Sequence, residues 1–480
     1  MNIREAGSTS VDTGAASVSG SDDSVPGAGG ARLGNGCSLA PPTCPDRAAQ
    51  EICAERSALR RAAGASFIGN FVEWFDYASY GFLATVIARV FFPETDSTTA
   101  LLATFAVFAV SFVMRPIGGI FWGSLGDRKG RRWALSWSIL LMSGATFLIA
   151  LLPGYATIGL AAPVLLLLLR MVQGFSASGE YAGAAAFLAE YAPAGRRGLY
   201  TCFVPASTAT GLLAGSLFVT LLHATTSDAA LDSWGWRIPF LLAGPLGLVG
   251  RYIRVHLEDS PKYREMAASA DRQTTRCAPV TEVLRRHRGK VAIAFGVTCL
   301  NAVAFYLLLS YMPTYLVTEL GMREDLSFLA STISLTVYIA AVFAMGHLSD
   351  RFGRRRMLIL ACVLFIVLTV PLFTLLQGVN LAVVIAVEIA FGVMLTANDG
   401  TLATFLAEIF PTRVRYSGFA LSFNAANALF GGTAPFVATW LIQVTGSAAA
   451  PAWYLTAAAV LALGAMIASR ETAFTELAND

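Results

Sequence analysis

The stretch GSLGDRKGRR at residues 123–132 returns as GHLSDRFGRR at residues 346–355, an offset of 223 residues. Each copy combines an acid, glycine and a cluster of basic residues, and each lies between two long apolar segments. A charged hairpin that occurs once in each half of a hydrophobic chain indicates an internal duplication. The sequence therefore predicts two similar halves that lie in a membrane.

The composition excludes an ordinary soluble protein. The 480 residues are 55% hydrophobic and 14% charged, with a net charge of +3, whereas soluble domains carry about 25% charged residues. Apolar runs of roughly 20 residues match the length of a spanning helix and exclude the alternating strands of an outer-membrane barrel. Twelve such segments follow one another, at residues 64–92, 100–124, 133–152, 160–192, 198–222, 236–256, 290–318, 326–347, 357–376, 380–410, 414–441 and 450–469.

Polar stretches divide the chain into five parts. Residues 1–57 are rich in Gly, Ser, Ala and Asp and predict a disordered cytoplasmic tail. Residues 58–256 and 290–470 are expected to form two six-helix bundles, joined by the basic linker 257–289 and followed by a short tail, 471–480. The expected fold class is an all-α membrane protein with twelve transmembrane helices in two six-helix halves.

A second repeat supports this division. The sequence FLAE at residues 187–190 recurs at 405–408, an offset of 218 residues. Two halves in the same orientation read as a parallel repeat, which places a substrate site at mid-membrane between them. Basic residues occupy both hairpins and the loops after 192 and 410, whereas the alternate loops are neutral or acidic. Because basic loops remain in the cytoplasm, both termini are expected there.

Ionisable residues within spanning segments are the candidates for function, because a buried charge is costly in a membrane. The segment GNFVEWFDYASYGF carries Glu73 and Asp76 three residues apart, on one helix face that Tyr77 and Tyr80 extend. Two carboxylates close together in a low dielectric favour protonation of one of them. We expect proton coupling here, with Asp76 favoured as the deeper acid. The alternative is that both acids lie solvated among the cytoplasmic headgroups.

The remaining candidates lie in segments of both halves. Arg170 cannot lose its proton, so it requires an acid or an anionic ligand. The 218-residue offset places it on Glu388 of the second half and suggests a pair across the cavity; the alternative is a static ion pair that fixes packing. Glu180 joins the proton-coupling candidates. The substrate-binding candidates are Tyr77, Tyr80, Arg170, Gln173, Tyr181, Asn301, Tyr306, Glu388, Asn398 and Asp399.

The hairpins are assigned to gating. Their acids can pair with neighbouring arginines or cap the next helix, their glycines permit a tight turn, and Glu190 and Glu408 are expected to be partners of the basic residues. The gating candidates are Arg115, Gly123, Asp127, Arg131, Arg132, Asp350, Arg354 and Arg355. Arg115 in MRPIGG is expected near the cytoplasmic surface. Pairs of glycine such as Gly179 with Gly183, and Gly211 with Gly215, are interpreted as sites of close helix packing.

The twice-present hairpin with twelve segments resembles the major facilitator superfamily. The stretches GNFVEWFDYASYGF, RMVQGFSASGEYAGAAAFLAEYAPAGRRG, WGWRIPF and YMPTYL resemble its metabolite:proton symporter family, over residues 60–470. That family includes bacterial proline/betaine, α-ketoglutarate, shikimate and citrate transporters. The resemblance implies proton-coupled uptake across the inner membrane by alternating access. Features of the first and seventh segments are closest to the proline/betaine branch, and NALFGGTAPFVATWLIQVTG to the citrate and α-ketoglutarate branches.

We therefore expect a symporter of a small zwitterion or carboxylate, not an enzyme. The expected partners are this solute, a proton and the lipid bilayer, with no nucleic acid, and one chain is expected to suffice. No phosphate loop or HExxH occurs, and neither cysteines nor histidines stand at metal-binding spacing, so we expect no cofactor and no metal. Alternatives are a drug:proton antiporter of the same fold and a non-transporting membrane sensor.

Overall fold

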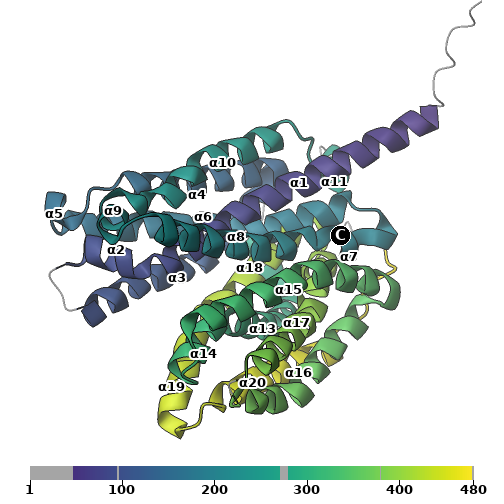
Figure 1. Cartoon of the computed structure of the whole chain (residues 1–480). Coiled ribbons are helices and arrows are strands. Elements are labelled where there is room, and N and C mark those ends of the chain that lie inside the picture. Colours follow the sequence, from purple (N-terminus) through teal and green to yellow (C-terminus); the bar gives the residue numbers. More distant parts are fainter. Residues whose placement is uncertain (1–46, 94–96, 271–278, 379, 478–480) are drawn as a thin grey trace, which may run out of the picture. The chain divides into compact units, whose positions relative to one another are not determined.

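The computed structural model describes residues 47–93, 97–270, 279–378 and 380–477. Its contacts divide the chain into two units, Met1–Glu51 and Ile52–Asp480, and all that follows concerns the second. In Figure 1 this unit consists of helices, of which the purple to teal ones form one group and the green to yellow ones another. We call these groups the first half, which ends at Val255, and the second half, which begins at Arg288.

The first half contains six long helical segments, several of them interrupted. Its elements are α1 (Arg47–Phe82), α2 (Ala84–Phe91), α3 (Ser97–Lys129), α4 (Arg131–Leu151), α5 (Tyr155–Ile158), α6 (Ala161–Tyr191), η1 (Ala194–Arg196), α7 (Arg197–Thr201), α8 (Phe203–Thr225), α9 (Asp228–Ala230), η2 (Leu231–Gly235) and α10 (Arg237–Val255). Two short helices follow in the linker, α11 (Pro261–Ala270) and α12 (Pro279–Arg286).

The second half repeats this series. Its elements are α13 (Arg288–Phe305), η3 (Tyr306–Tyr311), α14 (Met312–Thr318), α15 (Glu324–Phe352), α16 (Arg354–Leu376), α17 (Leu381–Ile409), η4 (Thr412–Val414), α18 (Arg415–Ala426), η5 (Asn427–Gly431), α19 (Ala434–Thr445) and α20 (Ala450–Ala468). Ten segments of the two halves are long and apolar enough to cross a membrane. With α1 and α3 they make twelve, as the sequence predicts.

The helices follow from the apolar runs, because a backbone in lipid must satisfy its own hydrogen bonds. The boundary that differs most from the prediction is the start of α1. Helix α1 begins at Arg47, inside the segment 1–57 that the sequence assigns to a tail, while residues 1–46 lie outside the described residues. The sequence EICAERSALRRAA lacks Gly and Pro and is rich in good helix formers, so the helix extends beyond the apolar run.

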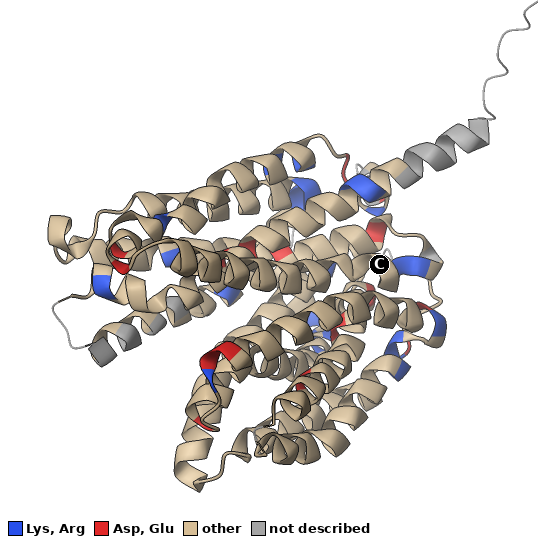
Figure 2. Ribbon diagram, in the orientation of Figure 1, with Lys and Arg blue, Asp and Glu red and all other residues tan. Residues whose placement is uncertain are grey.

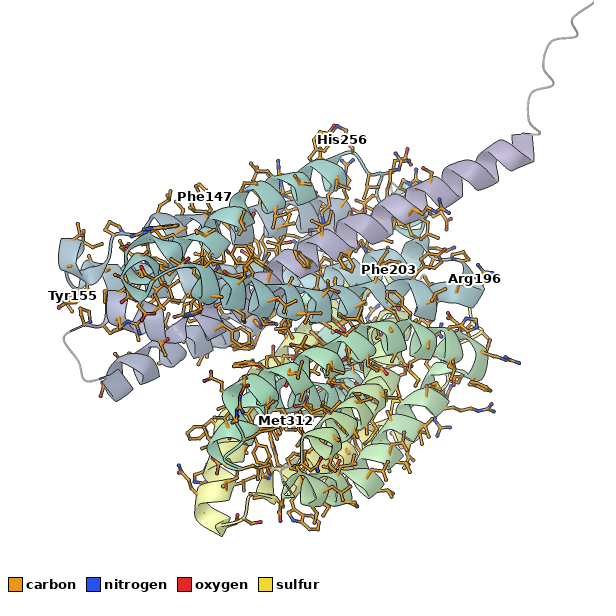
Figure 3. The ribbon with its side chains drawn as sticks, viewed as in Figure 1. Phe147, Tyr155, Arg196, Phe203, His256 and Met312 are labelled. Carbon is orange, nitrogen blue, oxygen red and sulfur yellow. The ribbon has the colours of Figure 1, made fainter. Side chains whose placement is uncertain are left out.

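The two halves meet through four sets of helices. Helix α3 packs on α18, α7 and α8 pack on α15, and α6 contacts both α17 and α18. At one of these contacts Phe203 of α8 (Figure 3) meets Phe343 of α15 with ring centroids 5.1 Å apart. The turns at Gly130 and Gly353 lie at the same end of the two halves, which we call the hairpin end. Figure 2 shows basic residues gathered around this end, near α7.

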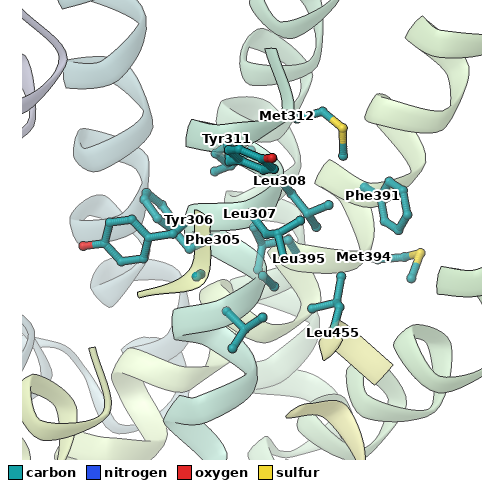
Figure 4. Close-up of a cluster of buried hydrophobic side chains, with 14 of the residues drawn as sticks. Phe305, Tyr306, Leu307, Leu308, Tyr311, Met312, Phe391, Met394, Leu395 and Leu455 are labelled. Carbon is teal, nitrogen blue, oxygen red and sulfur yellow. The ribbon is translucent and has the colours of Figure 1, made fainter. Parts of the chain in front are cut away.

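The core of the second half is built around a stretch of π-helix. Residues Tyr306–Tyr311 form η3, which widens the helix between α13 and α14. Figure 4 shows the hydroxyl of Tyr306 on the side away from Phe391 and Met394 of α17, while Leu307 and Leu308 face that cluster. Tyr306 remains buried in this cluster, with its hydroxyl directed away from α17.

Candidate functional site

At the hairpin end each half caps a helix of the other half. The carboxylate of Asp127 accepts hydrogen bonds from the backbone N–H groups of Tyr416 at 3.2 Å and Ser417 at 2.8 Å, in the first turn of α18. Asp350 accepts from the N–H groups of Gly198 at 2.7 Å and Leu199 at 2.9 Å, where α7 begins. A carboxylate at a helix N-terminus satisfies unpaired donors and complements the helix dipole. Of the two roles expected for these acids, pairing with a neighbouring arginine is confirmed, whereas the helix that each acid caps belongs to the other half and is not the next helix in sequence.

Buried ion pairs surround both acids. The Nη2 of Arg131 lies 3.1 Å from Asp127 and 3.3 Å from Glu190. The second half repeats this arrangement with Arg354, Asp350 and Glu408, at 2.8 and 3.3 Å. The FLAE glutamates are therefore partners of the hairpin arginines, as the sequence predicted. Glu190 also reaches the other half, because Arg415 Nη1 donates to it at 2.6 Å.

An acid after the last helix of each half caps the helix that follows the hairpin turn. Asp259 accepts from the N–H groups of Arg131 at 3.1 Å and Arg132 at 3.3 Å. Burial raises the pKa of the Asp259 carboxyl above its ordinary value. Glu471 does the same for Arg354 and Arg355, at 2.8 and 3.1 Å. The two turns pass through Gly130 and Gly353, whose φ angles of 102° and 100° favour glycine.

The second arginine of each turn binds backbone carbonyls. Arg132 Nη1 donates to Leu257 O at 2.8 Å, just beyond α10. Arg355 Nε donates to Met466 O at 3.2 Å, in the last turn of α20. Cations at helix C-termini satisfy carbonyls that have no partner within the helix. These two arginines therefore tie the hairpin to the last helix of their own half.

Two glycines of the first hairpin permit close packing, not a turn. Gly123 and Gly126 lie within α3, and a side chain at Gly126 would meet the ring of Tyr416. The Tyr416 hydroxyl donates to Gly179 O at 2.5 Å, and the same ring covers Gly183. Gly183 thus has the packing role that the sequence predicted, whereas the expected turn role of Gly123 is wrong. Gly211 and Gly215 likewise allow α8 to approach the backbone of α1.

Arg115 lies far from the hairpin and pairs with Glu73. Its Nη2 is 2.8 Å from Glu73 Oε1, and both side chains are almost fully buried. The expected position near the cytoplasmic surface is wrong, since α3 continues beyond Arg115 to Lys129 at the hairpin. Twelve residues of helix separate Arg115 from Asp127, which corresponds to about 18 Å. Its guanidinium also lies over the rings of Phe112 at 4.9 Å and Tyr77 at 5.2 Å.

Asp76 forms a second buried pair one turn along α1. Arg170 Nη1 donates to Asp76 Oδ2 at 3.0 Å and Gln173 Nε2 donates to the same oxygen at 3.1 Å. The guanidinium of Arg170 lies 3.6 Å from the ring centroid of Tyr80, whose hydroxyl donates to Thr104 O. The structure thus pairs the predicted residues Asp76, Arg170 and Gln173 within the first half.

The suggested pair of Arg170 with Glu388 is wrong. Glu388 lies in α17 and accepts a hydrogen bond from Ser331 of α15 at 3.1 Å. Arg170 lies in α6 and Glu388 in α17, which are corresponding helices of the two halves. Corresponding positions in a duplicated chain need not be in contact. Asn398, also in α17, is fully buried.

Two further buried acids, one in each half, have different kinds of partner: Glu180 pairs with an arginine, and Asp399 accepts hydrogen bonds from uncharged side chains. Glu180 binds Arg254 of α10, whose Nη1 lies 2.8 Å from Glu180 Oε2 and whose Nη2 donates to the other oxygen. Arg254 was not predicted, although an arginine at the end of an apolar segment was a visible signal. Asp399 of the second half accepts from Asn301 and Tyr338 and has no ion-pair partner among the described residues.

A cavity of about 20 Å³ lies between the halves, room for about one water molecule. It brings together Glu73, Tyr181, Asn301, Tyr306 and Asp399 of the predicted residues, together with Arg115. The other lining residues were not among the predicted sites: Trp74, Pro205, Thr208, Phe305, Phe423 and Asn427.

Aromatic contacts close the cavity on two sides. Tyr181 of α6 stacks on Phe423 of α18, with centroids 4.4 Å apart and planes 4° apart. Trp74 of α1 contacts Phe305 at 4.9 Å and Tyr306 at 6.1 Å. Each contact joins a residue of the first half to one of the second. Because both halves line the cavity, a movement of the halves relative to one another would change its size.

Hydrogen bonds across the halves gather toward the hairpin end. Besides the helix caps, Asn424 Nδ2 donates to Ser178 O at 2.8 Å and Cys202 Sγ to Gly400 O at 3.3 Å. Beyond the cavity, at the ends remote from the hairpins, ring contacts such as Phe82 with Phe328 join the halves. The structure is therefore closed by polar contacts at the hairpin end.

Two repeated helical halves around a buried, charged cavity define the class of secondary transporters. The family model of the Major Facilitator Superfamily matches residues 66–431, with a second match at 294–475. The chain belongs to the major facilitator superfamily.

Its relatives are named transporters of small solutes. The "Proline/betaine transporter" of Salmonella typhimurium is 38% identical over 424 residues, 86% of this chain and 84% of that protein. The "Glycine betaine/proline/ectoine/pipecolic acid transporter OusA" of Dickeya dadantii shows the same identity and coverage. The solved structure of the proton:xylose symporter XylE bound to 6-bromo-6-deoxy-D-glucose matches with a TM-score of 0.75 at 17% identity, over 88% of this chain and 98% of that one.

Proposed function

We propose that the protein is a proton-coupled symporter that imports a zwitterionic solute of the proline or betaine type across the inner membrane. One observation carries the proposal: α1 bears two buried carboxylates, Glu73 and Asp76, each ion-paired to an arginine of another helix. A carboxylate that alternates between an arginine and a proton can couple proton movement to a change of conformation. The similarity to proline/betaine transporters supports the choice of solute.

The hairpin end is the cytoplasmic gate in this proposal, with both termini on that side. Its basic residues support this orientation under the positive-inside rule. Import then requires the solute to enter from the opposite end, followed by release of the caps on α18 and α7. A single copy of the chain carries every group invoked, which supports function as a monomer.

The test is solute accumulation in proteoliposomes with an imposed pH gradient, acidic outside. A gradient of one pH unit should support about tenfold accumulation for one proton per solute. The double variant Glu73→Gln/Asp76→Asn should lose accumulation against a gradient. The matched control is Asp325→Asn, which alters an exposed ion pair with Arg323 at the end of α15 that is remote from the hairpin.

Three results would refute the proposal. Accumulation that persists in the double variant would remove the two acids from coupling. Outward movement of hydrophobic cations under the same gradient would indicate an antiporter. Binding of proline or glycine betaine without any flux would indicate a sensor.

A further inference from the structure

The cavity is lined by charged side chains of both halves. The first half supplies Glu73 and Arg115, and the second half supplies Asp399 with Asn301. The lining contains one cation, Arg115, and two acids, Glu73 and Asp399, so only one of the two acids can pair with a cation of the lining. A ligand that carries one positive and one negative group would allow two pairs of opposite charge to form.

The pair of Glu73 and Arg115 is incompletely satisfied. It is joined by a single hydrogen bond of 2.8 Å, and Glu73 Oε2 and Arg115 Nε are buried without hydrogen-bond partners. Buried polar atoms are almost always paired in folded proteins, so unpaired ones at a cavity require an explanation. Arginine can bind a carboxylate through two parallel hydrogen bonds, which the present contact with Glu73 does not use.

The other side of the cavity suits a bulky cation. The carboxylate of Asp399 is held in place by Asn301 and Tyr338 and has no basic partner among the described side chains. The aromatic rings of Trp74, Tyr306 and the Tyr181–Phe423 stack line the same space. Aromatic faces bind quaternary ammonium groups by cation–π interaction, and a nearby carboxylate adds direct attraction.

We propose that this cavity, once a movement of the halves has widened it beyond its present volume of about 20 Å³, binds its zwitterion in one orientation: the solute carboxylate replaces Glu73 on Arg115, and the solute cation lies against Asp399 and the aromatic rings. The exchange takes place only when Glu73 binds a proton. This inference rests on the proposed function and assigns its substrate site.

Charge balance explains why proton and solute bind together. With Glu73 ionised, the solute carboxylate would be repelled by it and would compete with it for Arg115. With Glu73 protonated and no solute, Arg115 would be left as an unpaired buried cation, which is strongly unfavourable. When both bind, Arg115 pairs with the solute carboxylate and Asp399 with the solute cation, so neither charge is left alone.

Other charged groups act on Glu73 and are part of the expected pH dependence. Asp76 and Glu180 lie within electrostatic range, and each is paired with an arginine of its own. The titratable and charged groups that face Glu73 from the surrounding elements are Asp76 and Tyr77 of α1, Arg115 of α3, Glu180 and Tyr181 of α6, Arg254 of α10, Tyr306 of η3 and Asp399 of α17.

The proton exchange is tested by binding and counterflow of glycine betaine in the full-length protein. In the wild type the dissociation constant should rise with pH, approaching about tenfold per unit where Glu73 is ionised. Glu73→Gln should bind at all pH values with less than a twofold change per unit, exchange solute in counterflow, and fail to accumulate it on a pH gradient. Counterflow in this variant also shows that it is folded.

The orientation is tested by three matched compounds. Glycine betaine carries both groups, tert-butylacetate replaces its ammonium by carbon, and choline lacks its carboxylate. Loss of one partner of a buried charge pair typically weakens binding by tenfold or more. Asp399→Asn should therefore reduce the preference for glycine betaine over tert-butylacetate by about tenfold or more, and Arg115→Gln should do so for the preference over choline. Asp399→Glu and Arg115→Lys should recover part of each preference.

Several outcomes would overturn the assignment. They are a Glu73→Gln variant whose affinity keeps the wild-type pH dependence, an Asp399→Asn variant with unchanged preference, and exchanged effects of the two substitutions. Asp399→Asn or Arg115→Gln could bind no compound at all. In that case, wild-type preference in Asp399→Glu or Arg115→Lys would support the role assigned to that charge. Loss of the preference in the charge-conserving variant would contradict it. A wild-type protein that moves no zwitterion would instead refute the proposed function itself.

Discussion

The cap that Asp127 forms on α18 offers a direct test of how the hairpin end is closed. Replacing Asp127 by alanine removes two hydrogen bonds, to the N–H groups of Tyr416 and Ser417, and the ion pair with Arg131. A hydrogen bond to a charged group contributes about 1.5–3 kcal/mol, so losing two weakens the closed state by about 3 kcal/mol or more. This corresponds to a change on the order of 100-fold in the balance between closed and open hairpin ends.

Hydrogen–deuterium exchange read by mass spectrometry provides the assay. Peptides that cover the first turn of α18 should exchange faster in Asp127→Ala, by a factor on the order of 100 where exchange requires opening. Transport turnover should fall more than solute affinity, because the cap lies far from the cavity. The comparison variant is Asp127→Asn, whose single amide oxygen can accept from only one of the two N–H groups that the two carboxylate oxygens cap, so exchange should rise by less than in Asp127→Ala. Unchanged exchange in Asp127→Ala, or a loss of affinity with normal turnover, would refute the reasoning.

Three further predictions concern other parts of the structure. Glu180→Gln leaves Arg254 buried without its carboxylate and should destabilise the protein by about 3–5 kcal/mol, seen as a lower thermal unfolding temperature in detergent; an unchanged temperature would contradict the pair. Gly431→Val should displace the ring of Tyr306, which a Cβ there would contact closely, so solute affinity should fall with little change in folding; wild-type affinity would show that the ring can give way. Because burial raises the pKa of Asp259, the folded state binds more protons than the unfolded one, and stability from this group decreases as pH rises above its ordinary value. Asp259→Asn keeps the cap without the charge and should therefore stabilise the protein at neutral pH more than at pH near 4, as thermal unfolding at both pH values would reveal.

Much of the fold follows from the sequence because its signals are local. A spanning helix requires a long apolar run, and each of the twelve segments contains one. Helix ends that lie beyond the apolar run were harder to predict, because helix propensity and not hydropathy sets them. The start of α1 at Arg47 is an example. The interruption at η3 was not visible either, since a π-turn depends on how Tyr306 packs in three dimensions.

The sequence indicated most of the residues of the candidate site, but it was less successful in indicating which side chains pair with one another. Glu73 and Asp76 were recognised because a charge in an apolar segment is conspicuous. Arg115 was misplaced because its burial depends on Glu73 of another helix, which the apolar run around it does not reveal. Pairing depends on which helices meet, and duplication gave the false suggestion of Arg170 with Glu388.

The exchange of caps at the hairpin end has a consequence for assembly. Each half offers one carboxylate, Asp127 or Asp350, and each offers one helix start that the other half satisfies. In the linker, α11 contacts α6 of the first half and η4 of the second, and α12 contacts α3 of the first half and both α13 and α18 of the second, so each linker helix touches both halves. A chain divided between α11 and α12 would give two pieces, each with one capping carboxylate and one helix start that the other piece caps. Co-expressed pieces should therefore associate in the correct register.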